Sequence, residues 1–211
     1  MGGGAGNDGR VSDARSQPLH EQHVPDDPLR LFRDWYERAQ GVEEKASLMT
    51  LATANEQARP SARTVQLEGC DRRGFLFYTG HESRKGRELA ANPQAALCFY
   101  WHASGHQVRV EGSVVRASLD DDEAGWAAAA VESTDARQDE AVAGRADLEA
   151  RVAELRARYG SDAPPLPEDW GAYRLVPDAY EFWQYRDDKL HDRFRYRLGR
   201  DASWEIERLF P

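Results

Sequence analysis

The sequence predicts a mainly β protein of the α+β type, in which an antiparallel barrel is flanked by helices. Two observations carry this prediction. Short apolar runs rich in Val, Phe, Tyr and Trp recur along the chain, and clusters of Gly, Asn, Asp and Pro separate them as tight turns. A single short helix is inserted between these runs, which favours an antiparallel barrel over a parallel α/β sheet. The expected strands cover residues 47–54, 62–67, 75–78, 95–101, 107–117, 172–176, 180–185, 194–198 and 204–209.

Composition limits the classes of protein to which the chain can belong. Its 211 residues are 40% hydrophobic and 10% aromatic, which is enough for a sizeable core. A formal net charge of -9 and a pI near 5.2 argue against a nucleic acid or an anionic membrane as a partner. The chain has no long apolar run for a membrane span or a signal peptide, so we expect a soluble cytoplasmic protein.

The usual signatures of catalysis and metal binding are missing from the sequence. Cys70 and Cys98 lack the spacing of metal ligands or of a disulfide framework. The six histidines form no metal cluster, and we expect His102 and His106 to share a surface turn. None of the GxGxxG, GxxxxGK[ST], HExxH or GxSxG motifs occurs. The sequence therefore predicts no metal site.

The chain divides into a tail and one domain. Residues 1–25 are glycine-rich and polar, which is typical of a disordered tail, and residues 26–211 form a single domain. Asp27 as N-cap and Pro28 at the first helical position begin a helix that extends to about residue 39. Two further helices are expected at residues 119–131 and 147–159.

A strand, a turn and a helix follow one another where the chain is best suited to bind an anion. The aromatic strand 75–78 leads into a polar turn, and Ser83 can then cap a helix over residues 84–92. Free backbone N–H groups and hydroxyls at such a helix start attract anions. Arg84 and Lys85 add charges suited to a phosphate. A solvated Arg/Lys pair on an ordinary helix is an equally good interpretation of this stretch alone.

Further polar residues support the anion interpretation. Arg63 lies in an otherwise apolar strand and needs an anionic partner, because an unpaired buried charge is costly. In a chain that is acidic overall, Arg63, Arg84 and Lys85 suggest that positive charge is concentrated on a bound phosphate. The remaining polar candidates are Gln107 and the group that contains Trp183, Lys189, His191 and Arg193.

Several stretches together carry a more specific signal. They are Asp27-Pro-Leu-Arg-Leu-Phe32, Arg59-Pro-Ser-Ala-Arg63, Phe77-Tyr-Thr79, Ser83-Arg-Lys85, Asn92-Pro93, Tyr100-Trp-His102, Gln107-Val108, Pro165-Leu-Pro167, Glu181-Phe-Trp-Gln184, Leu190-His-Asp-Arg193 and Arg208-Leu-Phe-Pro211. In these stretches the sequence resembles the pyridoxamine 5'-phosphate oxidase family, which includes the phenazine-biosynthesis oxidases. The resemblance covers nearly everything after about residue 26. It implies an FMN-binding split β-barrel that is active as a homodimer, with FMN at the subunit interface.

The resemblance also implies roles for individual residues. Arg63, Ser83, Arg84 and Lys85 would hold the flavin phosphate and its surroundings. The rest of the FMN site would be lined by Tyr78, Thr79, Gln107, Gln138, Trp183 and Arg193. Lys189 and His191 match positions that face the substrate in the family, and Lys189 stands where an arginine is usual. The flavin would accept the hydride, while the protein supplies binding, orientation and electrostatics.

Two departures from the family pattern concern the substrate. Where the vitamin oxidases carry a lysine that meets the substrate phosphate, this chain carries Glu68. The family's Tyr/Arg/Ser cluster for the same phosphate is replaced by the alanine-rich segment 125–131, and the family's Gln-Ser pair aligns with Gln138-Asp139 across a gap. These differences predict that the FMN pocket is kept and the substrate-phosphate pocket is lost.

The aromatic C-terminal region gives a second reason to expect a homodimer. Its aromatic residues are more than one small barrel is expected to bury alone, and aromatic residues are favoured at interfaces. These residues are Phe182, Trp183, Tyr185, Phe194, Tyr196 and Trp204.

The leading functional hypothesis is an FMN-dependent oxidase of the phenazine type. It would take two electrons from a small aromatic or heterocyclic substrate and pass them to oxygen. The alternatives are a pyridoxamine/pyridoxine 5'-phosphate oxidase with a rearranged phosphate site and a flavin-binding protein without turnover. Lys189 and His191 on the substrate side favour an enzyme over a carrier.

Overall fold

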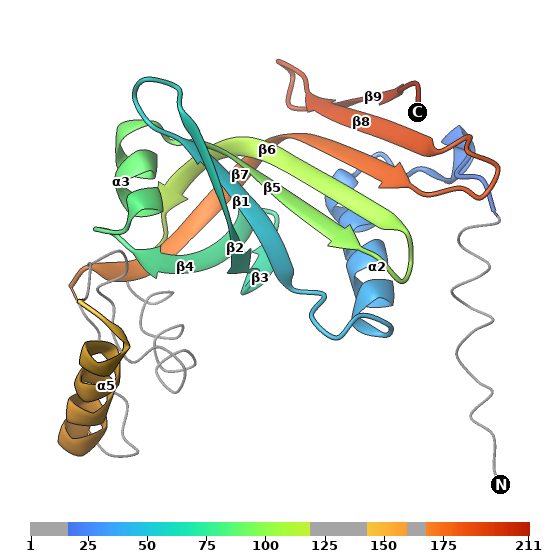
Figure 1. Ribbon diagram of the computed structural model, residues 1–211. Helices are drawn as coiled ribbons and strands as arrows, with labels where there is room; N and C mark the ends of the chain where they lie inside the picture. The colour runs from blue at the N-terminus through green and yellow to red at the C-terminus, as the bar shows by residue number, and fades with distance from the viewer. Residues whose placement is uncertain (1–16, 119–142, 160–167) are drawn as a thin grey trace, which may run out of the picture.

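One large antiparallel sheet forms the body of the computed structural model, which describes residues 17–118, 143–159 and 168–211 (Figure 1). Its nine strands run in the order β2-β1-β5-β6-β7-β4-β3, with β8 paired to β7 and β9 paired to β8. The strands are β1 (Leu48–Ala54), β2 (Pro60–Gln66), β3 (Gly69–Asp71), β4 (Gly74–Gly80), β5 (Gln94–Trp101), β6 (His106–Arg116), β7 (Trp170–Gln184), β8 (Asp192–Leu198) and β9 (Trp204–Arg208). The helices are η1 (Glu21–His23), α2 (Pro28–Gln40), α3 (Arg84–Ala91) and α5 (Arg145–Tyr159). The prediction of a mainly β protein with flanking helices is confirmed.

Strand β7 is the place where the sheet divides. It pairs with β6 over most of its length, and it also pairs with β4 through residues 170–175 and with β8 through residues 179–184. The sequence predicted two strands here, at residues 172–176 and 180–185. The structure has one strand, because Pro177 lies opposite Gly112 where the β6–β7 register shifts, and a bulge tolerates a residue without an N–H.

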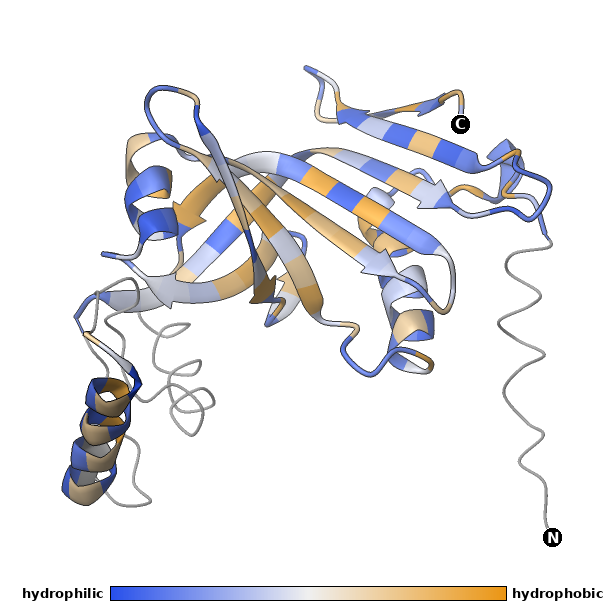
Figure 2. Cartoon of the chain, viewed as in Figure 1, coloured by the Kyte–Doolittle hydropathy of each residue, from blue (hydrophilic) through white to orange (hydrophobic). Residues whose placement is uncertain are grey.

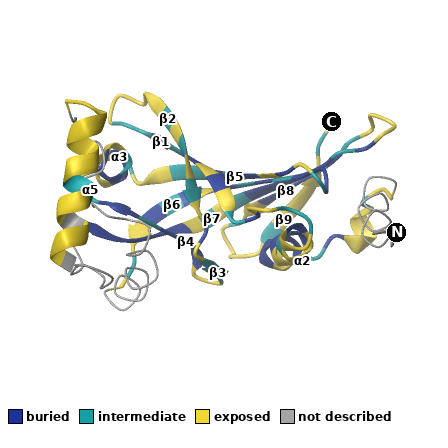
Figure 3. Ribbon diagram, turned by 60° about the horizontal axis from the view of Figure 1, so that its bottom comes forward, coloured by how far each residue is buried: buried dark blue, intermediate teal, exposed yellow. Residues whose placement is uncertain are grey.

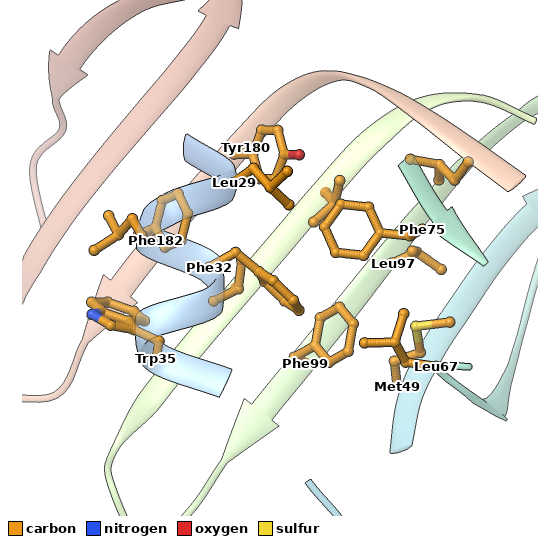
Figure 4. Packing of buried hydrophobic residues seen from close by; sticks show 14 of the residues in the cluster. Leu29, Phe32, Trp35, Met49, Leu67, Phe75, Leu97, Phe99, Tyr180 and Phe182 are labelled. Carbon is orange, nitrogen blue, oxygen red and sulfur yellow. The ribbon is translucent and has the colours of Figure 1, made fainter. Parts of the chain in front are cut away.

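The core lies between the sheet and α2. Leu29, Phe32 and Trp35 fall on one face of α2 and point at the aromatic side chains of the strands (Figure 4). Phe32 packs edge-on against Phe75 and Phe99, with ring centroids 4.8 and 5.1 Å away. Asp27 caps this helix as predicted, since its side chain accepts a hydrogen bond from the Leu29 N–H at 2.9 Å.

Apolar and polar residues alternate along β6 and β7 (Figure 2). Because neighbouring residues in a strand point to opposite faces, the alternation separates a buried face from a second, partly exposed face. Val108, Phe182 and Phe194 are buried in the core, whereas Gln107, Trp183 and Arg193 are only half-buried. The second face carries part of the candidate site described below.

Residues 17–25 are ordered against the C-terminal strands. Residues 17–25 were expected to be disordered, but they lie along β8 and β9 and include the turn η1. The Leu19 N–H donates to Asp192 Oδ2 at 3.0 Å, and the Tyr196 hydroxyl donates to the Pro25 carbonyl at 2.8 Å. These partners lie more than 170 residues away in sequence, so local composition could not reveal them.

Two smaller predictions also fail. The stretch from Cys70 to Gly74 was expected to be a turn, but residues 69–71 form the short strand β3 beside β4. His106 was expected on the surface, yet it begins β6, is buried, and stacks on Trp35 with a centroid distance of 4.0 Å.

Helix α5 confirms the predicted helix at 147–159, but its surface is largely exposed (Figure 3). Leu148, on its expected apolar face, is 44% exposed. The predicted helix at 119–131 lies outside the described residues. Among the described helices, none is both long and apolar enough to cross a membrane.

Helix α3 lies close to the end of β4 because Gly86 has no side chain. A Cβ atom at this position would come within 2.3 Å of the His81 carbonyl oxygen and 2.5 Å of the Gly80 carbonyl oxygen. Both obstacles are backbone atoms, which a rotamer change cannot move. The first turn of the helix is therefore pressed against the turn that precedes it.

We predict that Gly86→Ala destabilises the protein by about 1–3 kcal/mol, since the added methyl group forces α3 away from β4. Gly69→Ala is the matched control, because a Cβ there meets nothing within 4 Å. Urea unfolding of both variants measures the effect. Equal free energies of unfolding for the two variants would contradict the close packing described here.

Candidate active site

The turn between β4 and α3 is built as the sequence predicted. Ser83 is the N-cap of α3, and its hydroxyl accepts a hydrogen bond from the Gly86 N–H at 3.2 Å. The same hydroxyl donates to the Gly80 carbonyl at 2.7 Å and lies 3.2 Å from the Thr79 hydroxyl. Thr79 and Ser83 are both buried. Their hydroxyls therefore shape the turn, and the cationic side chains that follow provide its charge.

Arg63 and Arg84 meet at a buried carboxylate that the sequence analysis missed. Glu88 Oε1 accepts a hydrogen bond from Arg84 Nε at 2.9 Å, and Glu88 Oε2 lies 3.4 Å from Arg63 Nη2. Glu88 Oε2 also accepts hydrogen bonds from the hydroxyls of Thr53 and Ser61, both at 2.5 Å. The anionic partner that Arg63 needed is thus a side chain of the same chain.

This carboxylate is ionised in spite of its burial. Burial raises the pKa of Glu88, but the hydrogen bonds from Ser61, Thr53 and Arg84 outweigh burial and lower the pKa to about 2. The sequence contained one indication of the Arg84–Glu88 ion pair, because these residues are four positions apart on a helix. The contacts of Glu88 with β1 and β2 depend on the tertiary fold.

The cationic residues differ in exposure. The side chain of Arg63 is 22% exposed, whereas that of Arg84 is 61% exposed at the start of α3. Lys85 is half-buried. In β4, the strand that leads into this turn, Tyr78 stacks on Trp170 with ring centroids 4.8 Å apart. Two guanidinium groups and an ammonium at a helix N-terminus are a donor set that fits a phosphate.

A second group of predicted site residues, Gln107, Trp183 and Arg193, forms a row across the sheet that Tyr100 extends to a fourth strand. Tyr100 lies opposite Gln107, Gln107 opposite Trp183, and Trp183 opposite Arg193. Residues that are directly paired in an antiparallel sheet point to the same face. The row therefore places an amide, an indole and a guanidinium side by side on the partly exposed face.

Arg193 is held in this row by a second buried carboxylate. Glu181 accepts hydrogen bonds from Arg193 Nε at 2.9 Å and from Arg193 Nη2 at 3.2 Å. It also accepts one from Arg109 Nη2 at 3.0 Å. Because both oxygens of Glu181 bind the guanidinium, the plane of Arg193 is fixed beside Trp183.

The predicted substrate-side residues lie in the loop that follows β7. The His191 ring packs 4.9 Å from Trp183 and 5.2 Å from Tyr185 between centroids. Its Nδ1 accepts a hydrogen bond from the Arg186 N–H at 3.0 Å, so the ring proton is on Nε2. Lys189 has a positive φ of 67°, and its Nζ donates to the Tyr185 hydroxyl at 3.2 Å.

A cavity of about 580 Å³ opens beside this loop. His191 lines it, together with Leu190, His20, Arg208 and Phe210. Residues of the N-terminal segment and of the C-terminus thus help to wall a space next to the predicted substrate side. The sequence could not place these two chain ends together.

The two groups of site residues lie at opposite ends of β7. Thr79 and Gly80 pair with Gly171 and Trp170 at the start of this strand, beside α3. Trp183 lies thirteen residues further along, which is about 40 Å measured along a strand. Figure 1 shows α3 and β8 at the two ends of the sheet. One protomer therefore does not bring the predicted site residues together.

Glu68 lies apart from both groups, between β2 and β3. Its N–H donates to the Leu76 carbonyl at 2.9 Å. The residue is exposed, but neighbouring atoms partly desolvate the carboxyl, and this raises its pKa. Within the described part of the chain, the carboxylate makes no ion pair, and the neighbouring Arg73 pairs instead with Asp71 at 2.7 Å. Gln138 and the alanine-rich segment 125–131 lie outside the described residues.

The described residues contain no group of three or more His, Cys, Asp or Glu side chains that could hold a metal ion. The polar residues of both groups are mainly arginine, lysine, glutamine and histidine. This composition suits an anionic, aromatic ligand better than a cation.

Comparisons with known proteins agree with this fold. A family model described as pyridoxamine 5'-phosphate oxidase matches residues 37–163, and a second, described as pyridoxine 5'-phosphate oxidase C-terminal dimerisation region, matches residues 170–211. A crystal structure of PhzG from Burkholderia lata, in complex with tetrahydrophenazine-1-carboxylic acid, has a TM-score of 0.83 and 30% identity. That match covers 93% of this chain and 100% of the other.

Relatives of higher identity are named pyridoxine/pyridoxamine 5'-phosphate oxidase. A pyridoxine/pyridoxamine 5'-phosphate oxidase of Cupriavidus pinatubonensis is 46% identical over 198 residues, which are 92% of this chain and 93% of the relative. One of Myxococcus xanthus is 43% identical over 198 residues, which are 92% of this chain and 96% of the relative. The mainly β sheet is thus a split barrel, and the chain belongs to the pyridoxamine 5'-phosphate oxidase family.

Proposed function

We propose that this protein is an FMN-dependent oxidase that works as a homodimer. Each of its two sites would combine two parts from different subunits. One part is the α3 end, which contains Arg63, Ser83, Arg84 and Lys85. The other is the β6–β8 face, which contains Gln107, Trp183 and Arg193. The separation of the two groups of site residues along β7 carries this proposal. Neither group has both a phosphate-binding part and an aromatic part that suits a flavin ring, and a second copy supplies what the first lacks.

The α3 end fits the phosphate of FMN. Arg84 and Lys85 would hold the phosphate by charge-assisted hydrogen bonds at the start of the helix, and Arg63 would add positive potential from β2. The buried hydroxyls of Thr79 and Ser83 hold the turn in shape. Here the prediction from sequence is refined, since Ser83 acts through the helix cap.

The β6–β8 face fits the ring system of FMN. Trp183 offers an aromatic surface, while Gln107 and Arg193 offer hydrogen-bond donors along the same row. Bound FMN would supply the redox chemistry, accepting two electrons from the substrate and passing them to oxygen. His191, with its proton on Nε2, can donate a hydrogen bond to a substrate in the adjacent space, and Lys189 adds a positive charge there.

The homodimer is supported by the dimerisation region named in the family model and by exposed side chains on the same face. Tyr100, at the end of the row, is 57% exposed, which is unusual for an aromatic residue in a central strand. The earlier argument from aromatic content needs correction. Phe182, Phe194 and Tyr196 are buried in the core of their own protomer, so only the remaining aromatics can serve an interface.

For the substrate, Glu68 favours a small aromatic or heterocyclic compound without a phosphate. The resemblance places a phosphate-binding lysine at this position, and the structure has an exposed carboxylate there. The crystal structure of PhzG with a phenazine derivative supports the same class. The second candidate, oxidation of pyridoxine or pyridoxamine 5'-phosphate, is favoured by the names of relatives that are 43–46% identical. A carrier without turnover would consume no oxygen with either substrate.

We predict that Arg84→Ala weakens FMN binding about ten- to a hundredfold, because it removes one charge-assisted contact with the phosphate. Titration of FMN into the apoproteins, followed by flavin fluorescence, measures the change. Arg145→Ala is the control, since Arg145 makes the same kind of i,i+4 ion pair on α5. Equal dissociation constants for wild type and Arg84→Ala would remove this turn from the phosphate site.

We further predict that wild type oxidises pyridoxine 5'-phosphate with kcat/KM below about 10⁴ M⁻¹s⁻¹, and that Glu68→Lys raises this value at least tenfold. A pair of unit charges about 4 Å apart interacts by about 4 kcal/mol at an effective dielectric of about 20. Reversing the sign of the charge at position 68 therefore has a large effect on the binding of a substrate phosphate. Oxygen uptake is the assay. Glu149→Lys, which changes the net charge equally on α5, is the control.

The opposite result would establish the second candidate. If wild type exceeds that efficiency with pyridoxine 5'-phosphate, the protein is a vitamin oxidase in spite of Glu68. If activity is low and Glu68→Lys leaves it unchanged, Glu68 does not determine specificity.

A further inference from the structure

We propose that Glu88 is a positioning residue that holds Arg63 and Arg84 in place for the phosphate of the bound ligand. This inference rests on the proposed function and deepens it, because it explains how the phosphate end is organised before a ligand arrives. Glu88 itself does not touch the ligand in this account. It acts through the two arginines.

The contacts of Glu88 join three separate elements. Thr53 reaches it from β1, Ser61 and Arg63 from β2, and Arg84 from α3. The carboxylate is 7% exposed, so water contributes little to its solvation. Both of its oxygens accept hydrogen bonds, one from Arg84 Nε and the other mainly from the two hydroxyls. Glu88 therefore fixes the start of α3 relative to the β1–β2 hairpin.

Arg63 is fixed by the same network. Its Nη1 donates to the Leu51 carbonyl at 3.1 Å and to the Thr53 hydroxyl at 2.7 Å. Its Nη2 bonds to the Ser61 hydroxyl and lies near Glu88. Thr53 and Ser61 thus bind both Glu88 and Arg63, so that a change in the carboxylate is transmitted to the guanidinium.

The charges of the cluster also match a phosphate. Two arginines brought close to one another repel, and the carboxylate between them offsets the repulsion. With Lys85 included, the cluster keeps a net charge of about +2, which suits a phosphate monoester that carries about -1.5 to -2 at neutral pH. Since Glu88 remains ionised at neutral pH, this balance is present in the unliganded protein.

A purely electrostatic view leads to the opposite expectation for a Glu88 variant. If Glu88 only reduced the positive potential, its removal would make the phosphate bind more tightly. If Glu88 positions the arginines, its removal leaves them repelling and misplaced, and the phosphate binds more weakly. The sign of the change in affinity therefore distinguishes the two views.

The test compares FMN with riboflavin, which has the same ring but no phosphate, in wild type and Glu88→Gln. We expect Glu88→Gln to weaken FMN binding about tenfold or more and to change riboflavin binding less than about twofold. Glu149→Gln is the matched control, because the exposed Arg145–Glu149 pair has the same spacing and joins the same atoms, Nε and Oε1, at 2.7 Å. Both dissociation constants of the control should equal those of wild type.

A second readout needs no ligand. Because the pKa of Glu88 is lowered from 4.5 to about 2 on folding, its contribution to stability is present above about pH 4.5 and is lost as the pH falls towards 2. Urea unfolding of the apoproteins should therefore show a stability gap between wild type and Glu88→Gln that narrows over this pH range. A gap that is independent of pH would contradict the ionised network.

Three results would overturn the inference. FMN binding to Glu88→Gln that equals or exceeds that of wild type would show that Glu88 does not position the arginines. An equal loss of affinity for FMN and for riboflavin in Glu88→Gln would show that Glu88 has a general structural role. If Glu88→Gln does not fold, Ser61→Ala, which removes one donor to Glu88, carries the test, and unchanged FMN binding in that variant would refute the proposal. If wild type itself binds FMN no better than riboflavin, the proposed phosphate site fails instead.

Discussion

The hydrogen-bonded ladder along β7 determines where both halves of the candidate site lie. Its first part pairs with β4 and so sets the position of the turn that leads into α3. Its last part pairs with β8 and sets the row that contains Trp183 and Arg193. Because one continuous strand separates the two groups, no rearrangement of side chains can join them within a protomer. This backbone constraint is the reason why the proposed function requires a second subunit.

At each end of β7, a buried glutamate holds a pair of arginines. Glu88 binds Arg63 and Arg84, and Glu181 binds Arg109 and Arg193. A guanidinium with a fixed plane loses less conformational entropy when it binds a ligand than one that is mobile. The acidic net charge of the chain is therefore compatible with an anionic cofactor, because local pairing controls the charges that face it.

The sequence was informative where local chemistry decides the structure. The N-caps at Asp27 and Ser83 follow from short-range rules and were predicted correctly. The strands other than β3 and β7 were predicted to within two residues of their observed bounds. Glu88 was missed because three of its four donors come from β1 and β2, which only the fold brings close. The order of residues 17–25 was missed for the same reason. The resemblance named residues of both groups, but only the structure revealed how far apart they lie.

A mixed dimer can test whether each FMN site is shared between two subunits, as proposed. Arg84→Ala damages the α3 end, and Trp183→Ala damages the β6–β8 face. A heterodimer of the two variants, purified with two different tags, would keep one site in which both halves are intact. We expect about one FMN of wild-type affinity per heterodimer, against two per wild-type dimer. A heterodimer without any such site, or a monomer that binds FMN with wild-type affinity, would contradict it.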